Sequence, residues 1–481
     1  MNFATPLFLF FFLLIFGLRW ILPRLKFLPE WAPKPFLLAG SYFFYMAWNP
    51  KFGLLLFGTT ILDYWIGRKM DQKEGRSRAI LLSISLVLNL SVLAFFKYFI
   101  FFMQSGNAVF SAFGLNLSLP VWRIVLPVGI SFYTFQSLSY TIDVFRREIL
   151  PEKNFWNYAL FLSFFPQLVA GPIVPAKTFL PQLKTWVTWK ELPLREGLVL
   201  VLIGVWKKVV IADQLSILPD SFYRSPLEFS SAYAWAAVFA YSLQIYCDFS
   251  GYTDIALGSA LLLGFRLTEN FRMPYLASGF SDFWRRWHIS LSSWLRNYLY
   301  IPLGGNRKSE PRTYINLFLT MLLGGLWHGA SWNFVVWGGF HGIFLGLERL
   351  GKKFWPGSFS PENKSGILGR FSYRIFVILA VVLCWVFFRS PNWKTTGIVF
   401  EKLFGFSSGA DPALSSLRIL FIAFFLFFAA TWIGNRDEKY GSFRKFYEGL
   451  HPVLFGILVG VGLLLGAVFS SESQPFIYFV F

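Results

Sequence analysis

The stretch "LLGGLWHGASWNFVVWGG", residues 322–339, is apolar and rich in glycine, and it contains one histidine, His328. Ionisable side chains are costly in an apolar environment and are usually kept there for a purpose. On continuous helical spacing, small residues such as Gly324, Gly325 and Ser331 share the face of His328. Small residues let a second helix approach closely, or leave a cavity that another molecule can enter. His328 is therefore either a packing histidine bonded to a neighbouring helix or a functional group.

The composition of the whole chain extends this apolar pattern. Of 481 residues, 55% are hydrophobic, 21% are aromatic and only 14% are charged, whereas a soluble domain has about a quarter charged residues. Apolar runs of roughly 20 residues, the length of a transmembrane helix, recur from end to end. A β-barrel would show short alternating segments instead. The composition predicts an all-α polytopic integral membrane protein.

The apolar runs predict roughly ten to twelve spans in a single transmembrane domain, residues 1–481. A segment broken by four prolines, 157–183, is interpreted as a re-entrant element buried by protein. The net charge of +19 comes from Lys and Arg in short loops, which indicates cytoplasmic loops and anionic lipid rather than nucleic acid. The candidate spans are 5–22, 35–48, 52–67, 79–103, 124–143, 195–216, 230–247, 251–265, 313–347, 369–388, 414–434 and 452–470.

Residues 278–300 have aromatic and leucine side chains at alternating spacings of four and three. Arg285 and Arg286 lie on the opposite, polar face. This pattern predicts an amphipathic helix at the cytoplasmic membrane surface. His288 falls on its apolar side and would point into the membrane domain, whereas His341 is expected to face away from His328.

The stretch "QIYCDFSGYTDIALG", residues 244–258, places Asp248, Tyr252 and Asp254 within an apolar region. Two carboxylates with a glycine between them indicate a kinked or broken helix that lines a polar cavity. No metal-ligand spacing, Walker loop or nucleophile elbow accompanies them. These absences argue against a metalloprotease, an ATP-driven pump and a serine hydrolase, and leave general-base chemistry, transport and proton relay.

Six motifs in order along most of the chain carry a resemblance to one family: residues 127–146, 164–173, 244–258, 270–307, 324–342 and 385–389. The chain resembles the membrane-bound O-acyltransferase (MBOAT) family, and within it the bacterial alginate O-acetyltransferase branch. The resemblance implies a helical core around a central tunnel, with the motif-bearing part at about 124–347, in a multi-pass protein of the bacterial inner membrane.

The resemblance also implies an activity. His328 and His288 match the two marker histidines of the family, and His328 is implied to be catalytic. A neutral histidine can take the proton of an acceptor hydroxyl as that hydroxyl attacks a thioester. The residues that we expect to bind substrate are Asp248, Tyr252, Asp254, Arg285, Arg286, Trp327 and Asn333.

The implied reaction passes an acetyl group from a cytoplasmic thioester, acetyl-CoA or an acyl carrier protein, to a polysaccharide hydroxyl. A partner acetyltransferase of the SGNH type outside the membrane could instead receive the group. No tightly bound cofactor and no metal are expected. Arginines of the 278–307 region, including Arg296 and Arg307, would suit a phosphate-bearing donor, or would anchor the chain to anionic lipid.

Two other functions fit the residues. A transporter or exporter could use the intramembrane aspartates and His328 as a path, but the chain shows no clear two-half repeat. A scaffold of a polysaccharide-synthesis complex would need the histidines only for packing.

Overall fold

The computed structural model describes residues 3, 5–25, 29, 31–115, 117–168, 171–185, 187–354, 367–468 and 476–477. Over these residues the regular elements are helices, with one isolated β-bridge between Phe229 and Ala410. The prediction of an all-α fold is confirmed. Residues 469–470 of the last predicted span and 169–170 of the 164–173 motif lie outside the described part.

The described residues gather into two compact units. The first comprises Met1–Gly197 and Ala256–Thr268, and the second comprises Leu198–Ile255 and Glu269–Phe481. Two helices, α10 (Leu194–Val205) and α13 (Ser231–Leu262), contribute residues to both units.

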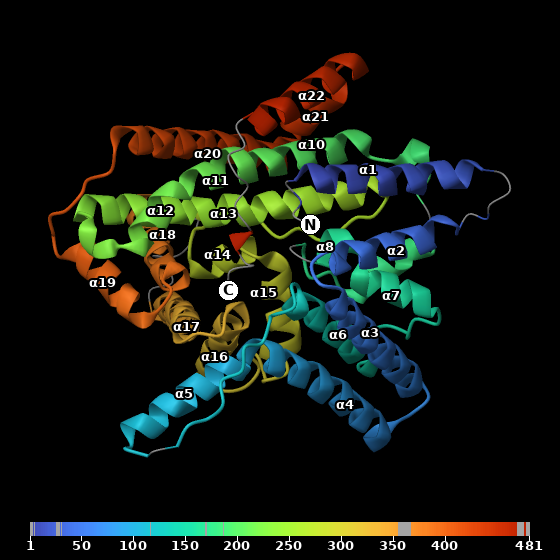
Figure 1. Ribbon diagram of the computed structural model, residues 1–481, viewed down its shortest axis with the longest axis horizontal. Coiled ribbons are helices and arrows are strands. Elements are labelled where there is room, and N and C mark those ends of the chain that lie inside the picture. The colour runs from blue at the N-terminus through green and yellow to red at the C-terminus, as the bar shows by residue number, and fades with distance from the viewer. Residues whose placement is uncertain are drawn as a thin grey trace. The chain divides into compact units, whose positions relative to one another are not determined.

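The first unit packs its helices around a buried carboxylate, Asp63. Its carboxylate accepts hydrogen bonds from Ser85, Asn89 and Ser137, at 2.5–2.8 Å. These partners lie on α4 and α6, which contact each other and α3 (Figure 1). A buried carboxylate that accepts three hydrogen bonds fixes the register of the helices around it. The helices of this unit are α1 (Pro6–Ile21), α2 (Pro33–Met46), α3 (Pro50–Asp71), α4 (Gly75–Leu93), α5 (Phe99–Ala112), α6 (Ile130–Phe145), α7 (Phe155–Ser163), α8 (Phe165–Leu168) and α9 (Ala176–Phe179).

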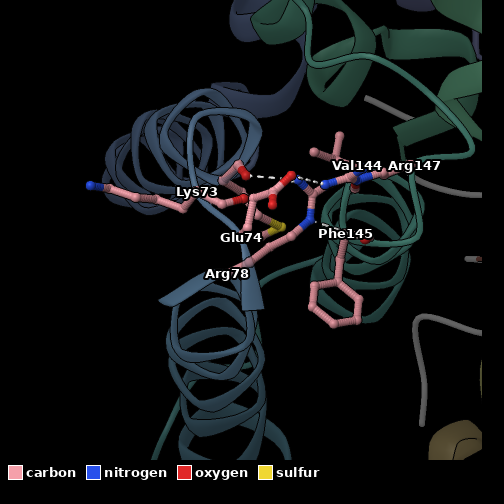
Figure 2. A network of polar contacts seen from close by, with 7 residues as sticks. Lys73, Glu74, Arg78, Val144, Phe145 and Arg147 are labelled. Carbon is pink, nitrogen blue, oxygen red and sulfur yellow. Dashed lines mark hydrogen bonds and ion pairs between the residues drawn. The ribbon is translucent and has the colours of Figure 1, made fainter. Parts of the chain in front are cut away.

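Arg78, at the start of α4, joins two helix ends. Its guanidinium donates hydrogen bonds to the carbonyl groups of Met70 in the last turn of α3 and of Lys73 just after it, and to those of Val144 and Phe145 at the end of α6 (Figure 2). The last carbonyls of a helix have no partner within the helix. A cation at this end also interacts favourably with the negative end of the helix dipole. One buried side chain thus satisfies the ends of both helices.

The second unit contains three of the six motifs in full, 270–307, 324–342 and 385–389, and most of a fourth, 244–258. Its core is rich in aromatic side chains, among them Trp287, Trp337 and Trp385, which are fully buried. Besides parts of α10 and α13, its helices are α11 (Asp213–Leu215), α12 (Ile217–Arg224), α14 (Phe280–Arg286), α15 (Ile289–Leu295), α16 (Glu310–His328), α17 (Trp332–Phe354), α18 (Ile367–Arg389), α19 (Trp393–Phe404), α20 (Leu414–Tyr440), α21 (Ser442–Gly449) and α22 (Pro452–Val468).

Three described helical segments are long and apolar enough to cross a membrane: Pro6–Arg24, Gly75–Ala112 and Leu368–Arg389. The bent pair Ser442–Gly449 and Pro452–Val468 would make a fourth. The apolar helices agree with a membrane protein. The predicted number of ten to twelve spans is not confirmed.

Two predicted helices are interrupted. The prediction of one continuous helix over 278–300 is wrong, because α14 ends at Arg286 and α15 begins at Ile289. The span expected over 313–347 is a hairpin, since α16 ends at His328 and α17 begins at Trp332. Both breaks place a marker histidine at a helix end. The proline-broken segment 157–183 forms short, largely buried helices, and its entry into a membrane stays a prediction.

Candidate active site

His328 is the last residue of α16, and residues 329–331 turn the chain into α17. The two helices lie side by side in Figure 1, with backbone against backbone. A Cβ on Gly325 would lie 2.2 Å from the Phe334 carbonyl oxygen, and one on Gly338 would lie 2.3 Å from that of Met321. Of the two alternatives for these glycines, close helix packing or a cavity, the structure shows close packing, because the other helix fills the space beside them.

His288 occupies the break between α14 and α15, with left-handed backbone angles (φ 44°, ψ 55°). Hydrogen bonds to the preceding loop hold this break. The Ile289 amide donates to the Asn270 carbonyl at 2.9 Å, and the Ser290 hydroxyl donates to the Asn270 side chain at 2.6 Å. A left-handed conformation is unfavourable for a residue other than glycine and is frequent at functional sites.

The two marker histidines meet in the core of the second unit. The ring centroids of His288 and His328 are 6.1 Å apart, and both side chains are buried. Phe249 of α13 packs edge-on against His288 with centroids 4.8 Å apart. Trp337 does the same against His328 at 5.1 Å. Aromatic rings thus keep water from both imidazoles.

Burial lowers the pKa of His288, which lies outside the apolar spans, to about 3. Its imidazole is therefore neutral near pH 7. A neutral imidazole has one nitrogen that can accept a proton and one that donates a hydrogen bond.

His341 lies closer to this site than the sequence predicts. Its ring is 4.8 Å from that of Trp337, the residue that also contacts His328. The expectation that His341 faces away is wrong, because it assumed one continuous helix through residues 329–331.

Trp327 and Asn333 flank His328 and have different surroundings. The Trp327 ring lies 5.9 Å from His288 and 5.1 Å from His328, between centroids, so it borders both imidazoles. Asn333 donates from its side-chain amide to the Ser390 carbonyl at 3.0 Å. This hydrogen bond holds the start of α17 against the residue that follows α18, so the Asn333 amide stabilises the fold.

Asp248 and Asp254 are both paired with lysines that are absent from the predicted site residues. Lys208 Nζ lies 2.7 Å from Asp248 Oδ1 and 2.7 Å from Asp213 Oδ1, and all three side chains are buried. Lys207 Nζ lies 2.7 Å from Asp254 Oδ2. Two adjacent lysines in an apolar run were the available signal, because buried cations need partners.

The helix that bears these aspartates is unbroken, which corrects the prediction of a kink. Gly251 serves a crossing instead, since a Cβ there would lie 2.8 Å from the Gly204 carbonyl oxygen. Beside this crossing, residues 206–212 form a π-helix that carries Lys207 and Lys208. Tyr252 is buried, and its ring packs against Phe476 with centroids 4.4 Å apart.

The two arginines expected to bind substrate lie apart from the histidines' aromatic core. Arg285 is exposed. Arg286 pairs with Asp282 at 3.1 Å and donates to the Arg272 carbonyl. In the described part of the chain, no three His, Cys, Asp or Glu side chains gather as a metal site would require.

Comparison with known proteins gives matches that agree on one family of membrane-bound acyltransferases. The family model for MBOAT, the membrane-bound O-acyltransferase family, matches residues 82–388, which include both marker histidines. The probable alginate O-acetylase AlgI of Pseudomonas putida is 41% identical over 459 residues, 94% of this chain and 89% of that protein. The peptidoglycan O-acetyltransferase of Helicobacter pylori is 36% identical over 536 aligned positions, covering 100% and 97%. The teichoic acid D-alanyltransferase of Bacillus subtilis is 27% identical over 51% of this chain and 65% of that protein.

Proposed function

This chain belongs to the membrane-bound O-acyltransferase family and is an acyltransferase, and we propose that it transfers acetyl groups to a cell-envelope or secreted polysaccharide. Alginate and peptidoglycan are the acceptors in the names of the relatives that match most of the chain. Both are polysaccharides with free hydroxyl groups. A sugar hydroxyl is accordingly the proposed acceptor, reached directly or through an SGNH-type acetyltransferase outside the membrane.

The meeting of His288 and His328 is the observation that carries the proposal. The two residues lie on different helices, and their rings are 6.1 Å apart in a core that aromatic side chains enclose. Two packing histidines would have no need to converge. A reaction that moves a proton in a poorly hydrated site gains from an imidazole placed beside the reacting atoms.

His328 is the proposed general base. It takes the proton of the acceptor hydroxyl while the oxygen forms a bond to the thioester carbonyl carbon. The carbon–sulfur bond then breaks, and the departing sulfur receives the proton from the imidazolium. Such base assistance contributes about 10²–10⁴-fold to the rate. His288 and Trp327, which border His328, would position the thioester or the acceptor.

The donor is proposed to be acetyl-CoA or an acetylated carrier protein on the cytoplasmic side of the bacterial inner membrane. Exposed Arg285 offers positive charge to the phosphate groups that both donors bear, whereas the neighbouring Arg286 is already paired with Asp282. Phe249 contacts His288, and Phe476 packs against both Phe249 and Tyr252. Tyr252, with Asp248 and Asp254 of the same helix, is proposed to order the acceptor side of the site.

The test is ester-linked acetate on the envelope polysaccharides of a deletion strain that carries wild-type protein, His328→Ala or His451→Ala. His451 is an exposed histidine at the start of α22 and serves as the matched control. We expect wild type and His451→Ala to restore acetate and His328→Ala to fail, at equal membrane abundance. Full restoration by His328→Ala would refute the role of this histidine.

A further inference from the structure

A pocket of about 230 Å³ lies after α15, in the second unit. The π-helix Arg296–Tyr300 forms one side, and the turn at residues 304–307 forms the other. π-helical turns occur frequently at functional sites. The lining residues are Arg296, Tyr300, Ile301, Gly304, Gly305, Asn306 and Arg307.

The lining of this pocket is cationic and contains no acid. Arg296 and Arg307 are both exposed, and in the described part of the chain neither guanidinium group forms a salt bridge or a hydrogen bond. Lys308 adds a third positive charge nearby, because its side chain would contact a Cβ placed on Gly304 at 3.0 Å. By contrast, Arg286 is already neutralised by Asp282. Two arginines whose side chains have no acidic partner, Arg296 and Arg307, therefore lie together at the pocket.

The turn that closes the pocket depends on glycine. Gly304 and Gly305 have positive φ angles of 113° and 54°. Asn316 of α16 fixes the turn by donating to the carbonyls of Leu303 and Gly305 at 3.3 and 3.1 Å. The pocket walls are thus built by specific contacts, and the arginines are presented from a defined backbone.

We propose that this pocket binds a phosphate group. Arginine side chains bind phosphate oxygens with two parallel hydrogen bonds, and two arginines without partners suit a group of charge −1 to −2. The volume is below the roughly 300–1,000 Å³ of pockets that enclose whole drug-sized ligands. The pocket therefore takes the phosphate end of a larger molecule, either a phosphate-bearing thioester donor or an anionic phospholipid. The possibility that this phosphate belongs to the acyl donor rests on the proposed function.

The test is direct binding without turnover, by purified full-length protein in nanodiscs of phosphatidylcholine. The probes are coenzyme A, measured by calorimetry, and phosphatidylglycerol, measured by its enrichment around protein drawn from mixed-lipid nanodiscs. The variants are Arg296→Gln and Arg307→Gln. Arg312→Gln is the matched control, because Arg312 is exposed and close in sequence but does not line the pocket.

We expect each pocket variant to weaken binding of one probe by about tenfold or more, and the control to leave it unchanged. Weaker binding of coenzyme A identifies the donor as the source, and lost phosphatidylglycerol enrichment identifies lipid. Unchanged binding of both probes would overturn the proposal. Binding is measured without acetyl transfer, so this result is independent of the His328 test.

Discussion

The imidazole rings of His288 and His328 lie 6.1 Å apart, and each stands where a helix begins or ends. Residues at helix ends are free of the regular side-chain spacing within a helix. The left-handed turn at His288 and the tight turn after His328 therefore aim both rings into one aromatic core. The site depends on these two breaks as much as on the imidazoles.

The backbone of His288 gives a first prediction. Asparagine tolerates left-handed angles, whereas β-branched threonine, a polar residue of similar size, does not. We expect His288→Thr to be less stable than His288→Asn by about 1–2 kcal/mol, from thermal unfolding of purified protein in detergent. Both variants should lose acetyl transfer if the imidazole positions a substrate. Equal stability of the two variants would mean that the left-handed turn is not required.

The buried imidazole of His288 predicts a pH dependence of stability. Its pKa is about 3 in the folded protein against about 6.5 in an unfolded chain, so the unfolded state binds more protons between these values. Stability should therefore fall as the pH is lowered from about 6.5, by at most about 1.4 kcal/mol per pH unit from this group. His288→Asn should show a shallower fall than wild type, and His451→Asn should match wild type. Parallel curves for all three would contradict a desolvated His288.

Hydrophobic periodicity predicted helices correctly but not where they end. The aromatic spacing of residues 278–300 continues through the break at Trp287 and His288, because the break is imposed by hydrogen bonds that Ile289 and Ser290 donate to Asn270. The effect of a loop that lies about 20 residues away is not visible in the hydrophobic periodicity of the helix itself. The same error at residues 329–331 placed His341 on the wrong side.

The number of membrane spans could not be predicted from the sequence for a related reason. Apolar composition does not distinguish a helix that faces lipid from one that other helices enclose. α13 is buried along most of its length, whereas α5 contains no buried residue. The sequence offers Lys207 and Lys208 as cations in an apolar run, but their pairing with Asp248 and Asp254 depends on the crossing of Gly204 and Gly251, which local sequence does not indicate.

The glycines of the hairpin give a third prediction. Gly325→Ala and Gly338→Ala would each place a methyl group within 2.3 Å of a carbonyl oxygen on the other helix. We expect a loss of about 1–3 kcal/mol or more, seen as a lower unfolding temperature. Gly397→Ala in α19 is the control, because no atom lies within 4 Å of the added Cβ. It should be neutral or stabilising, since alanine favours a helix by up to about 1 kcal/mol. Equal effects at all three positions would rule out backbone contact at the hairpin.

The adjacent lysines give the last prediction. Lys208→Met would leave Asp213 and Asp248 buried without their cation, and removing one partner of a buried pair costs about 3–5 kcal/mol. Lys207→Met should cost less, because the side chains of Lys207 and Asp254 are 24% and 17% exposed and water can solvate the remaining carboxylate.

Adding Asp248→Asn to Lys208→Met should restore part of the lost stability, because it removes one uncompensated charge. Thermal unfolding of the three variants and wild type in detergent measures this order. If Lys208→Met were no less stable than Lys207→Met, the buried cluster would not depend on its central cation. Since Asp248 adjoins Phe249, which packs on His288, destabilising this cluster should also lower acetyl transfer. The Lys208→Met, Asp248→Asn double variant should recover transfer in step with stability if the cluster acts only by holding α13 in place.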